Sequence, residues 1–312
     1  MGEGPCVKRG LGGERAPAVA GAVASSIIWP TIESDNEMRS TMASAPTRVH
    51  VVTGGFPPGQ HGGHDMDFAR LRLLDMLYSD GNVRATTGND FTDMWKWLPV
   101  TDVLITYTAG PYADDPQNAI LRDWIGNGGH WVGLHGTSGG KAARMGDGKR
   151  AMVKMEHHET LGGFFINHPP IKRFTVDVKN VDSPILEGLP EQFDVIDEPY
   201  MIEITDRPNT DILLTAPIGP DTWPDFGFDY EEDTAIEADG VTRVFGYTRG
   251  IGEGGVCYIA LGHCHSPLTN SQPFVEDNAK DENGDNPRTL RFTWETDEYM
   301  QLLKNSLNWS RG

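Results

Sequence analysis

Short apolar runs and amphipathic segments alternate along the chain from residue 48 to residue 135. Runs rich in β-branched and other apolar residues, which predict buried strands, cover 48–53, 82–87, 101–108 and 130–135. The segments between them with helical patterns are 65–79, where Phe68, Leu71, Leu74 and Leu77 recur at helical spacing, and 115–129, which begins with Asp and ends with Gly. Strands that alternate with helices predict a mainly parallel sheet with helices on both faces.

The second half of the chain is richer in short alternating runs separated by Pro, Gly, Asn and Asp. These candidate strands are 172–180, 199–205, 210–216, 241–248 and 255–262. The polar stretches 220–240 and 269–289 predict long loops, and 297–310 has the pattern of an amphipathic helix. Because neither a repeat nor a linker divides the chain, we expect one α/β domain over residues 48–312.

The first 47 residues have a different character. Lys8 and Arg9 precede an Ala- and Gly-rich stretch, 16–29, which loosely resembles a signal peptide. The favoured interpretation is a disordered extension, or sequence upstream of a natural start at Met42. The alternative is a weak targeting segment, which would make the protein an exported one.

Charge and cysteine content narrow the function classes. The chain has 26 basic and 45 acidic residues, a formal net charge of −19, which argues against a nucleic-acid or anionic-membrane partner. No apolar run reaches the ~18 residues of a membrane span. Three cysteines without a CxxC pair fit a reducing compartment, so we expect a cytoplasmic protein that takes a small molecule. The sequence is compatible with a homo-oligomer and does not determine the oligomeric state.

The stretch Gly128–Gly140, GGHWVGLHGTSGG, carries the first candidate for chemistry. A short apolar run enters a glycine-rich turn with His135 at its tip, and we call this turn the elbow. Hydrolases of the G-x-S-x-G type place a serine at that position, but Ser138 comes three residues too late and no cysteine is near. The glycines of GGF and HGG also lack the G-x-G-x-x-G spacing that opens a dinucleotide-binding helix, and no P-loop pattern occurs. The elbow therefore predicts imidazole chemistry at an exposed turn, with His135 as acid, base or ligand.

Other histidines follow predicted strands. Ligand sites of parallel sheets lie at the carboxyl ends of the strands, so His64, from the loop after the first strand, should lie near His135. In ALGHCHS, strand alternation would place His263 and His265 on one side. Because neutral imidazoles bind zinc and similar ions, His64, His135, His263 and His265 are candidate ligands of a divalent metal. The alternative for each is a hydrogen-bonded structural role.

Glu198 in DEPYMIE is the best candidate carboxylate, although a solvated turn would explain it equally well. With His135 and His263 it completes our set of candidate catalytic residues. The candidate substrate-binding residues are His64, His158, His168, Tyr200 and Gly55. The aromatic residues of the first long loop could cover a sugar ring or simply anchor the loop; they are Trp223, Phe226, Phe228 and Tyr230.

Several stretches together resemble the trehalose-utilisation, or ThuA-like, family. They are VTGG followed by HD, then GGHWVGLHG, LGGFFINHPP, SPILEGLPEQFDVIDEPY and TRVFGYTRGIGEGGVCYIALGH, and they span Arg48 to His265 in the family's order. The resemblance implies a fold like that of class I glutamine amidotransferases, a flavodoxin-like sheet. It also implies that His135 occupies the position of their nucleophilic cysteine, and that His263 falls near their catalytic histidine.

The resemblance further implies a role in the use of trehalose or related glycosides, beside dehydrogenases that make 3-oxo-glucosides. We therefore expect an enzyme that acts on a sugar or 3-oxo-sugar by His and carboxylate acid–base chemistry, with or without a metal. It would be an isomerase, lyase or hydrolase. The alternative is a non-catalytic sugar-binding or regulatory module that lost the nucleophile. A glutamine amidotransferase is disfavoured because the cysteine is absent from the elbow.

Overall fold

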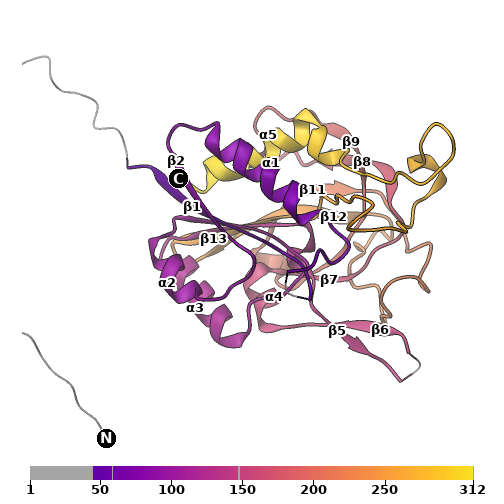
Figure 1. Ribbon diagram of the computed structural model, residues 1–312, viewed down its shortest axis with the longest axis horizontal. Helices are drawn as coiled ribbons and strands as arrows, with labels where there is room; N and C mark the ends of the chain where they lie inside the picture. Colours follow the sequence, from indigo (N-terminus) through magenta and orange to yellow (C-terminus); the bar gives the residue numbers. More distant parts are fainter. Residues whose placement is uncertain (1–44, 58, 147, 312) are drawn as a thin grey trace, which may run out of the picture. The chain divides into compact units, whose positions relative to one another are not determined.

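The computed structural model describes residues 45–57, 59–146 and 148–311. Within them the chain forms a mixed α/β structure around one large sheet (Figure 1). Its strands, in spatial order, are β2 (Val83–Gly88), β1 (Thr47–Gly54), β3 (Val103–Thr108), β4 (His130–Leu134), β13 (Gly254–Ile259), β12 (Arg243–Ile251), β11 (Asp211–Ala216), β8 (Lys172–Val178) and β9 (Gln192–Asp197). Residues 1–44 of the predicted extension lie outside the described part.

The sheet has a parallel half and an antiparallel half. Strands β2, β1, β3, β4 and β13 run parallel to one another. From β13 onward, β12, β11, β8 and β9 each pair antiparallel. In the first half, helices connect the buried apolar strands, and such crossovers allow parallel pairing. In the second half, the strands alternate apolar and polar residues and are joined without such helices, so they pair antiparallel. Small two-stranded sheets pair β7 (Gly163–Asn167) with β10 (Met201–Ile204) and β5 (Lys141–Arg144) with β6 (Arg150–Val153).

Helices lie on both sides of the large sheet. In Figure 1, α1 (Met66–Tyr78) and α5 (Asp297–Trp309) cover one face, and α2 (Met94–Trp97) and α3 (Asp115–Gly126) lie on the other. The short α4 (Glu156–Leu161) leads into β7. No helix within the described ranges is both long and apolar enough to span a bilayer.

Helix α1 begins where the sequence predicts, but its buried face matches the predicted repeat only in part: Leu77 is buried, and Phe68 and Leu74 are partly buried. Asp65 caps the helix by accepting a hydrogen bond from the Phe68 amide. The predicted face was wrong for Leu71, which is 64% exposed. Besides Leu77, the helix buries Ala69, Leu73 and Met76 against the sheet. Apolar residues lie on several sides of this helix. The position of the sheet determines which of them are buried, and Leu71 lies on a side that the sheet does not cover.

The parallel half places several chain segments at one edge. Strands β1, β3, β4 and β13 end there at Gly54, Thr108, Leu134 and Ile259, so the loops that follow them meet. One backbone bond ties two of these loops together, because the Asp65 amide donates to the Cys264 carbonyl over 2.7 Å. His64 Nε2 of the first loop also lies 3.1 Å from His135 Nε2 of the elbow, so the predicted convergence of these two segments is confirmed.

Candidate functional site

The elbow after β4 has a strained backbone. His135 has a φ of 42°, in the left-handed region that residues other than glycine rarely adopt, and a 3-10 turn, His135–Ser138, follows. The Tyr258 hydroxyl donates to the His135 carbonyl over 2.7 Å, and the Thr137 hydroxyl donates to the Thr106 carbonyl over 2.9 Å. The surrounding fold therefore holds the turn that the sequence predicts, and holds it at a local cost in backbone energy.

The His135 side chain is buried, whereas the sequence suggested an exposed turn. Its exposed fraction is zero. The Tyr200 ring stacks on it with centroids 4.0 Å apart, and the His64 ring lies edge-on at 5.0 Å. The prediction of exposure was wrong because residues distant in the sequence cover the tip of the elbow.

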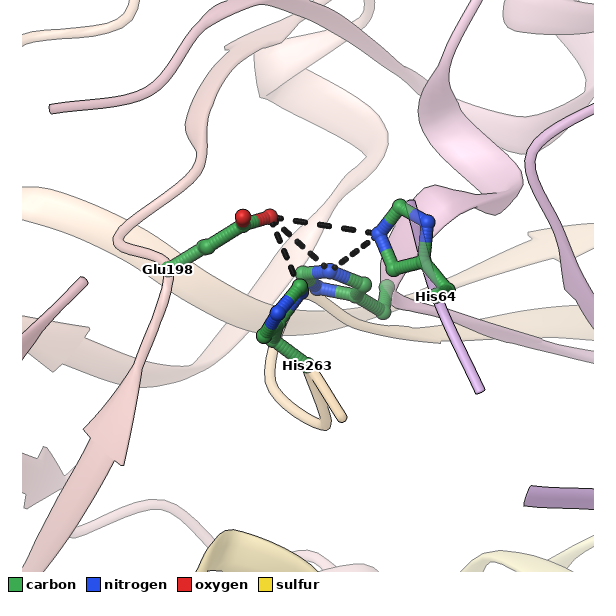
Figure 2. A group of neighbouring side chains, drawn as sticks. His64, Glu198 and His263 are labelled. Carbon is green, nitrogen blue, oxygen red and sulfur yellow. Dashed lines mark hydrogen bonds and ion pairs between the residues drawn. The ribbon is translucent and has the colours of Figure 1, made fainter. Parts of the chain in front are cut away.

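Four side chains converge at this point, and we call them the histidine–glutamate group: His64, His135, Glu198 and His263. One ligand-type atom from each lies within 4.8 Å of all the others. Glu198 Oε2 is 3.1 Å from His263 Nδ1, 3.5 Å from His135 Nε2 and 3.9 Å from His64 Nε2. Figure 2 shows His64, Glu198 and His263 pointing toward one another from separate segments. Three of the four predicted metal ligands meet here.

The fourth predicted ligand, His265, does not join the group. Its Nδ1 lies 2.9 Å from His263 Nε2, and its Nε2 lies 2.9 Å from the Pro287 carbonyl. The His263 and His265 rings contact each other, as expected for side chains on one side of the chain. The chain after β13 is irregular, however, and His265 lies on the far side of His263 from Glu198. The fourth side chain of the group is Glu198, where the sequence predicted His265.

Asp197, which sequence reasoning passed over, positions His263. Its carboxylate accepts the backbone amides of Gly262 and His263 over 2.8 and 2.9 Å. Burial raises the pKa of Asp197 to about 6, against the effect of His135 and of these hydrogen bonds. The only signal available in the sequence was its place directly before Glu198.

Burial also governs the protonation of the group. It lowers the pKa of His263 to about 4 and holds the pKa of His64 well below its usual range. Burial alone would raise the pKa of Glu198, but His168 and His263 outweigh it and hold that pKa well below its usual range. Burial therefore favours the neutral form of His64 and His263 beside an ionised Glu198 carboxylate.

A cavity of about 780 Å³ opens onto the group. This volume lies within the roughly 300–1,000 Å³ of small-molecule sites. His64, Glu198 and His263 line it, whereas His135 lies behind them. The aromatic lining residues are Phe56, Tyr112, Phe165, Tyr200, Phe226, Phe228 and Phe274. The cavity thus combines apolar ring faces with a polar end.

The long loops supply part of this lining. Of the four aromatic residues singled out from the first loop, Phe226 and Phe228 line the cavity. Trp223 is half exposed, whereas Tyr230 anchors the loop, because its hydroxyl donates to Asp221 over 3.0 Å. Phe274 of the second loop stacks on Phe226 at 4.1 Å and was missed, because a single Phe in a polar stretch gives no periodic signal.

Of the candidate substrate-binding residues, His64, His168 and Tyr200 line the cavity. His158 is buried behind the elbow, where its Nε2 lies 3.0 Å from the Gly139 carbonyl. Gly55 is a turn residue whose Cβ position lies 2.1 Å from the Gln60 carbonyl. The structure thus places His158 and Gly55 outside the cavity lining, since both serve to close turns.

A central α/β sheet with a strained turn at the end of one strand is the architecture of proteins that present a functional residue on an elbow. The chain belongs to the ThuA family. The family model, described as trehalose utilisation, matches residues 48–275. Among curated proteins, none matches this chain significantly.

Solved structures show the same fold. A ThuA-like protein of Bacteroides uniformis has a TM-score of 0.55 at 17% identity, over 87% of this chain and 94% of that one. A ThuA-like protein of Parabacteroides merdae has a TM-score of 0.52 at 16% identity, over 85% of this chain and 90% of that one. At such identities the likeness concerns the fold alone.

Proposed function

We propose that this chain is an enzyme of trehalose or related glycoside utilisation, acting on a sugar or 3-oxo-sugar derivative by proton transfer. The observation that carries the proposal is a buried carboxylate, Glu198, set among histidines in the wall of an aromatic-lined cavity. Membership of the ThuA family suggests the role in trehalose utilisation. The formal net charge of −19 suits a neutral substrate better than an anionic one.

The finer fold assignment belongs to the same proposal. We assign the chain to the flavodoxin-like architecture of class I glutamine amidotransferases, with His135 at the position of their cysteine. The parallel strand order β2-β1-β3-β4 and the strained backbone at His135 support it. An imidazole at that position cannot form the thioester of an amidotransferase, so the elbow serves another chemistry.

The residues of the cavity suggest a division of roles. Aromatic rings such as Phe226 and Phe228 bind the apolar C–H face of a sugar. A ketone acidifies the neighbouring C–H bonds, and a carboxylate or imidazole can remove such a proton to give an enolate. Glu198 and His168 line the cavity and are the proposed proton acceptors. Return of the proton to the other carbon isomerises the sugar, whereas loss of a leaving group gives elimination.

His135 and His263 act on Glu198 in this scheme. Their ring nitrogens lie 3.5 and 3.1 Å from its Oε2, so they form the immediate surroundings of the carboxylate. Removal of either ring would leave the buried carboxylate without a neighbour that now packs against it. We therefore expect His135→Ala to disable turnover even though its side chain does not line the cavity.

Proton NMR of the untagged protein with trehalose, other glucosides and their 3-oxo derivatives tests the proposal. Wild type should consume a 3-oxo sugar, while His135→Ala, Glu198→Gln and His168→Gln slow consumption by roughly 10²–10⁴-fold, the usual contribution of acid–base catalysis. His50→Gln, which removes a buried histidine of β1 outside the cavity lining, is the matched control and should retain turnover.

A non-catalytic sugar-binding module is the second candidate. The largely aromatic lining and the full burial of His135 favour it, because binding needs ring faces rather than titratable groups. In the same experiment, broadened sugar lines without consumption would support this candidate and contradict the enzyme. No change with any compound would contradict both.

A further inference from the structure

The hydrogen bonds behind the three histidines fix where their protons lie. His135 Nδ1 lies 2.8 Å from the Ala260 carbonyl, and His64 Nδ1 lies 2.9 Å from the Gly62 carbonyl. A carbonyl oxygen only accepts hydrogen bonds, so both Nδ1 atoms carry the proton. In the neutral rings, each Nε2 then presents a lone pair. Yet these two Nε2 atoms face each other at 3.1 Å.

The proton of His263 is fixed in the same way, through His265. His265 Nε2 donates to the Pro287 carbonyl over 2.9 Å, so its Nδ1 is an acceptor. That Nδ1 takes the proton of His263 Nε2 over 2.9 Å, which leaves His263 Nδ1 with a lone pair. This nitrogen is buried, has no hydrogen-bond partner, and lies 3.1 Å from Glu198 Oε2, which also only accepts when ionised.

Four acceptors therefore converge with no proton between them. Among the described residues, the only hydroxyl at hydrogen-bond distance from these four atoms is that of Tyr200, which lies 3.4 Å from His64 Nε2. Facing lone pairs repel in a buried site, and a cation at their centre removes the repulsion. The backbone carbonyls behind the rings are the outer partners that metal-bound histidines use to fix their tautomer.

The distances fit a small metal ion. A metal held at about 2.1 Å places neighbouring ligand atoms roughly 3.0 Å apart in an octahedron and roughly 3.4 Å apart in a tetrahedron. Four of the six separations between the ligand atoms of the histidine–glutamate group are 3.1, 3.1, 3.5 and 3.9 Å, and all six lie within 4.8 Å. Three imidazoles and one carboxylate favour zinc or a similar divalent transition metal over magnesium or calcium.

We infer that the histidine–glutamate group is a binding site for one divalent transition metal, with its open coordination positions toward the cavity. His64, Glu198 and His263 line the cavity and His135 closes the site from behind, so a substrate oxygen approaches from the cavity side. This inference deepens the proposed function, on which its choice of substrate rests: a bound metal would polarise a ketone oxygen of the sugar.

A bound metal also redistributes the proton-transfer roles. With Oε2 as a ligand, Glu198 is no longer a free base. His168 lines the cavity outside the group, and its Nδ1 donates to the Pro169 carbonyl over 2.9 Å, which leaves its Nε2 as an acceptor. His168 would then take the proton from the carbon beside the ketone, and a metal held by the group would supply the positive charge that stabilises the resulting enolate.

Titration of the chelator-treated, untagged full chain with Zn²⁺ and Co²⁺ tests the inference. Calorimetry should give one site, and Co²⁺ should give the visible absorption of a nitrogen-rich, low-coordinate site. His135→Ala and Glu198→Gln should each weaken binding at least 100-fold, while His50→Gln binds as wild type does. Circular dichroism shows which variants fold. If His135→Ala does not fold, Glu198→Gln still tests the site, because glutamine keeps the size and shape of the glutamate side chain.

Equal binding by wild type and folded variants, or no stoichiometric binding, would overturn the inference. Turnover separates it from the proposed function. Metal binding without consumption of any sugar would leave the metal site standing and contradict the enzyme. Full consumption by the metal-free protein would leave the enzyme standing and contradict a catalytic metal.

Discussion

At the scale of single residues, the site depends on which nitrogen of each histidine is free. Sequence spacing brings His263 and His265 together but cannot tell a ligand from its support. The structure does, because His265 is bonded to His263 Nε2 on one side and to the Pro287 carbonyl on the other. His265 is thus a positioning residue, which orients His263 without entering the cavity.

His265→Ala should weaken Zn²⁺ binding by roughly 10–100-fold, the usual cost of losing an outer partner of a ligand histidine. The loss has a physical cause in the tautomer, since His263 Nε2 then has no acceptor and Nδ1 is no longer obliged to stay unprotonated. Calorimetric titration measures the change. His265→Asn, which supplies an amide oxygen as acceptor, should recover part of the affinity; a merely structural role for His265 predicts no such recovery.

At the scale of elements, the site is assembled by the loops that follow parallel strands. The turn after β4 packs against the end of β3, where a Cβ on Gly136 would lie 2.6 Å from the Thr108 carbonyl. The loop after β13 is held by the Tyr107 hydroxyl and the Trp294 indole, which both donate to the Gly262 carbonyl. Rigid anchors of this kind keep the buried histidines at ligand distances.

Gly136→Ala should therefore destabilise the protein by roughly 1–3 kcal/mol, the usual cost of overpacking. It should also weaken Zn²⁺ binding, because the neighbouring His135 must move with the turn. Gly126→Ala is the control, since nothing lies within 4 Å of its Cβ at the end of α3, and it should be neutral or stabilise by about 0.5–1 kcal/mol. Thermal unfolding and zinc titration of both variants measure these effects. Equal stability and equal zinc affinity of the two variants would contradict the close approach at Gly136.

At the scale of the whole molecule, buried histidines make the fold sensitive to acid. His50 on β1 is stacked on Trp97 with centroids 4.0 Å apart, and its Nε2 has no hydrogen-bond partner. Burial lowers the pKa of His50 from its usual 6.5 to about 4. The unfolded chain therefore binds a proton more readily than the folded one between these two pH values.

The sign follows from linkage. The contribution of neutral His50 to stability is fully present above pH 6.5 and is lost as the pH falls toward about 4. His50→Gln should reduce the loss of stability between pH 7 and pH 4.5 by on the order of 1–2 kcal/mol, given about 1.4 kcal/mol per pKa unit. Thermal melts of both proteins across this range measure it. Parallel curves would show that His50 does not contribute.

The sequence by itself determined the parallel half of the sheet, the loops that meet at its edge and the elbow at His135. It could do so because strand and helix periodicities are local, and parallel strands bring their carboxyl ends to one side. It also placed His64, His135 and His263 in one neighbourhood, and Glu198 among the catalytic candidates.

Only the tertiary structure decided the remaining features. It turned the second half of the sheet antiparallel, buried Ala69 and Leu73 rather than Leu71, and covered His135 with Tyr200. It put Glu198 in the group and His265 behind it. These outcomes depend on contacts between segments far apart in the chain, for which a local pattern of apolar and polar residues carries no information.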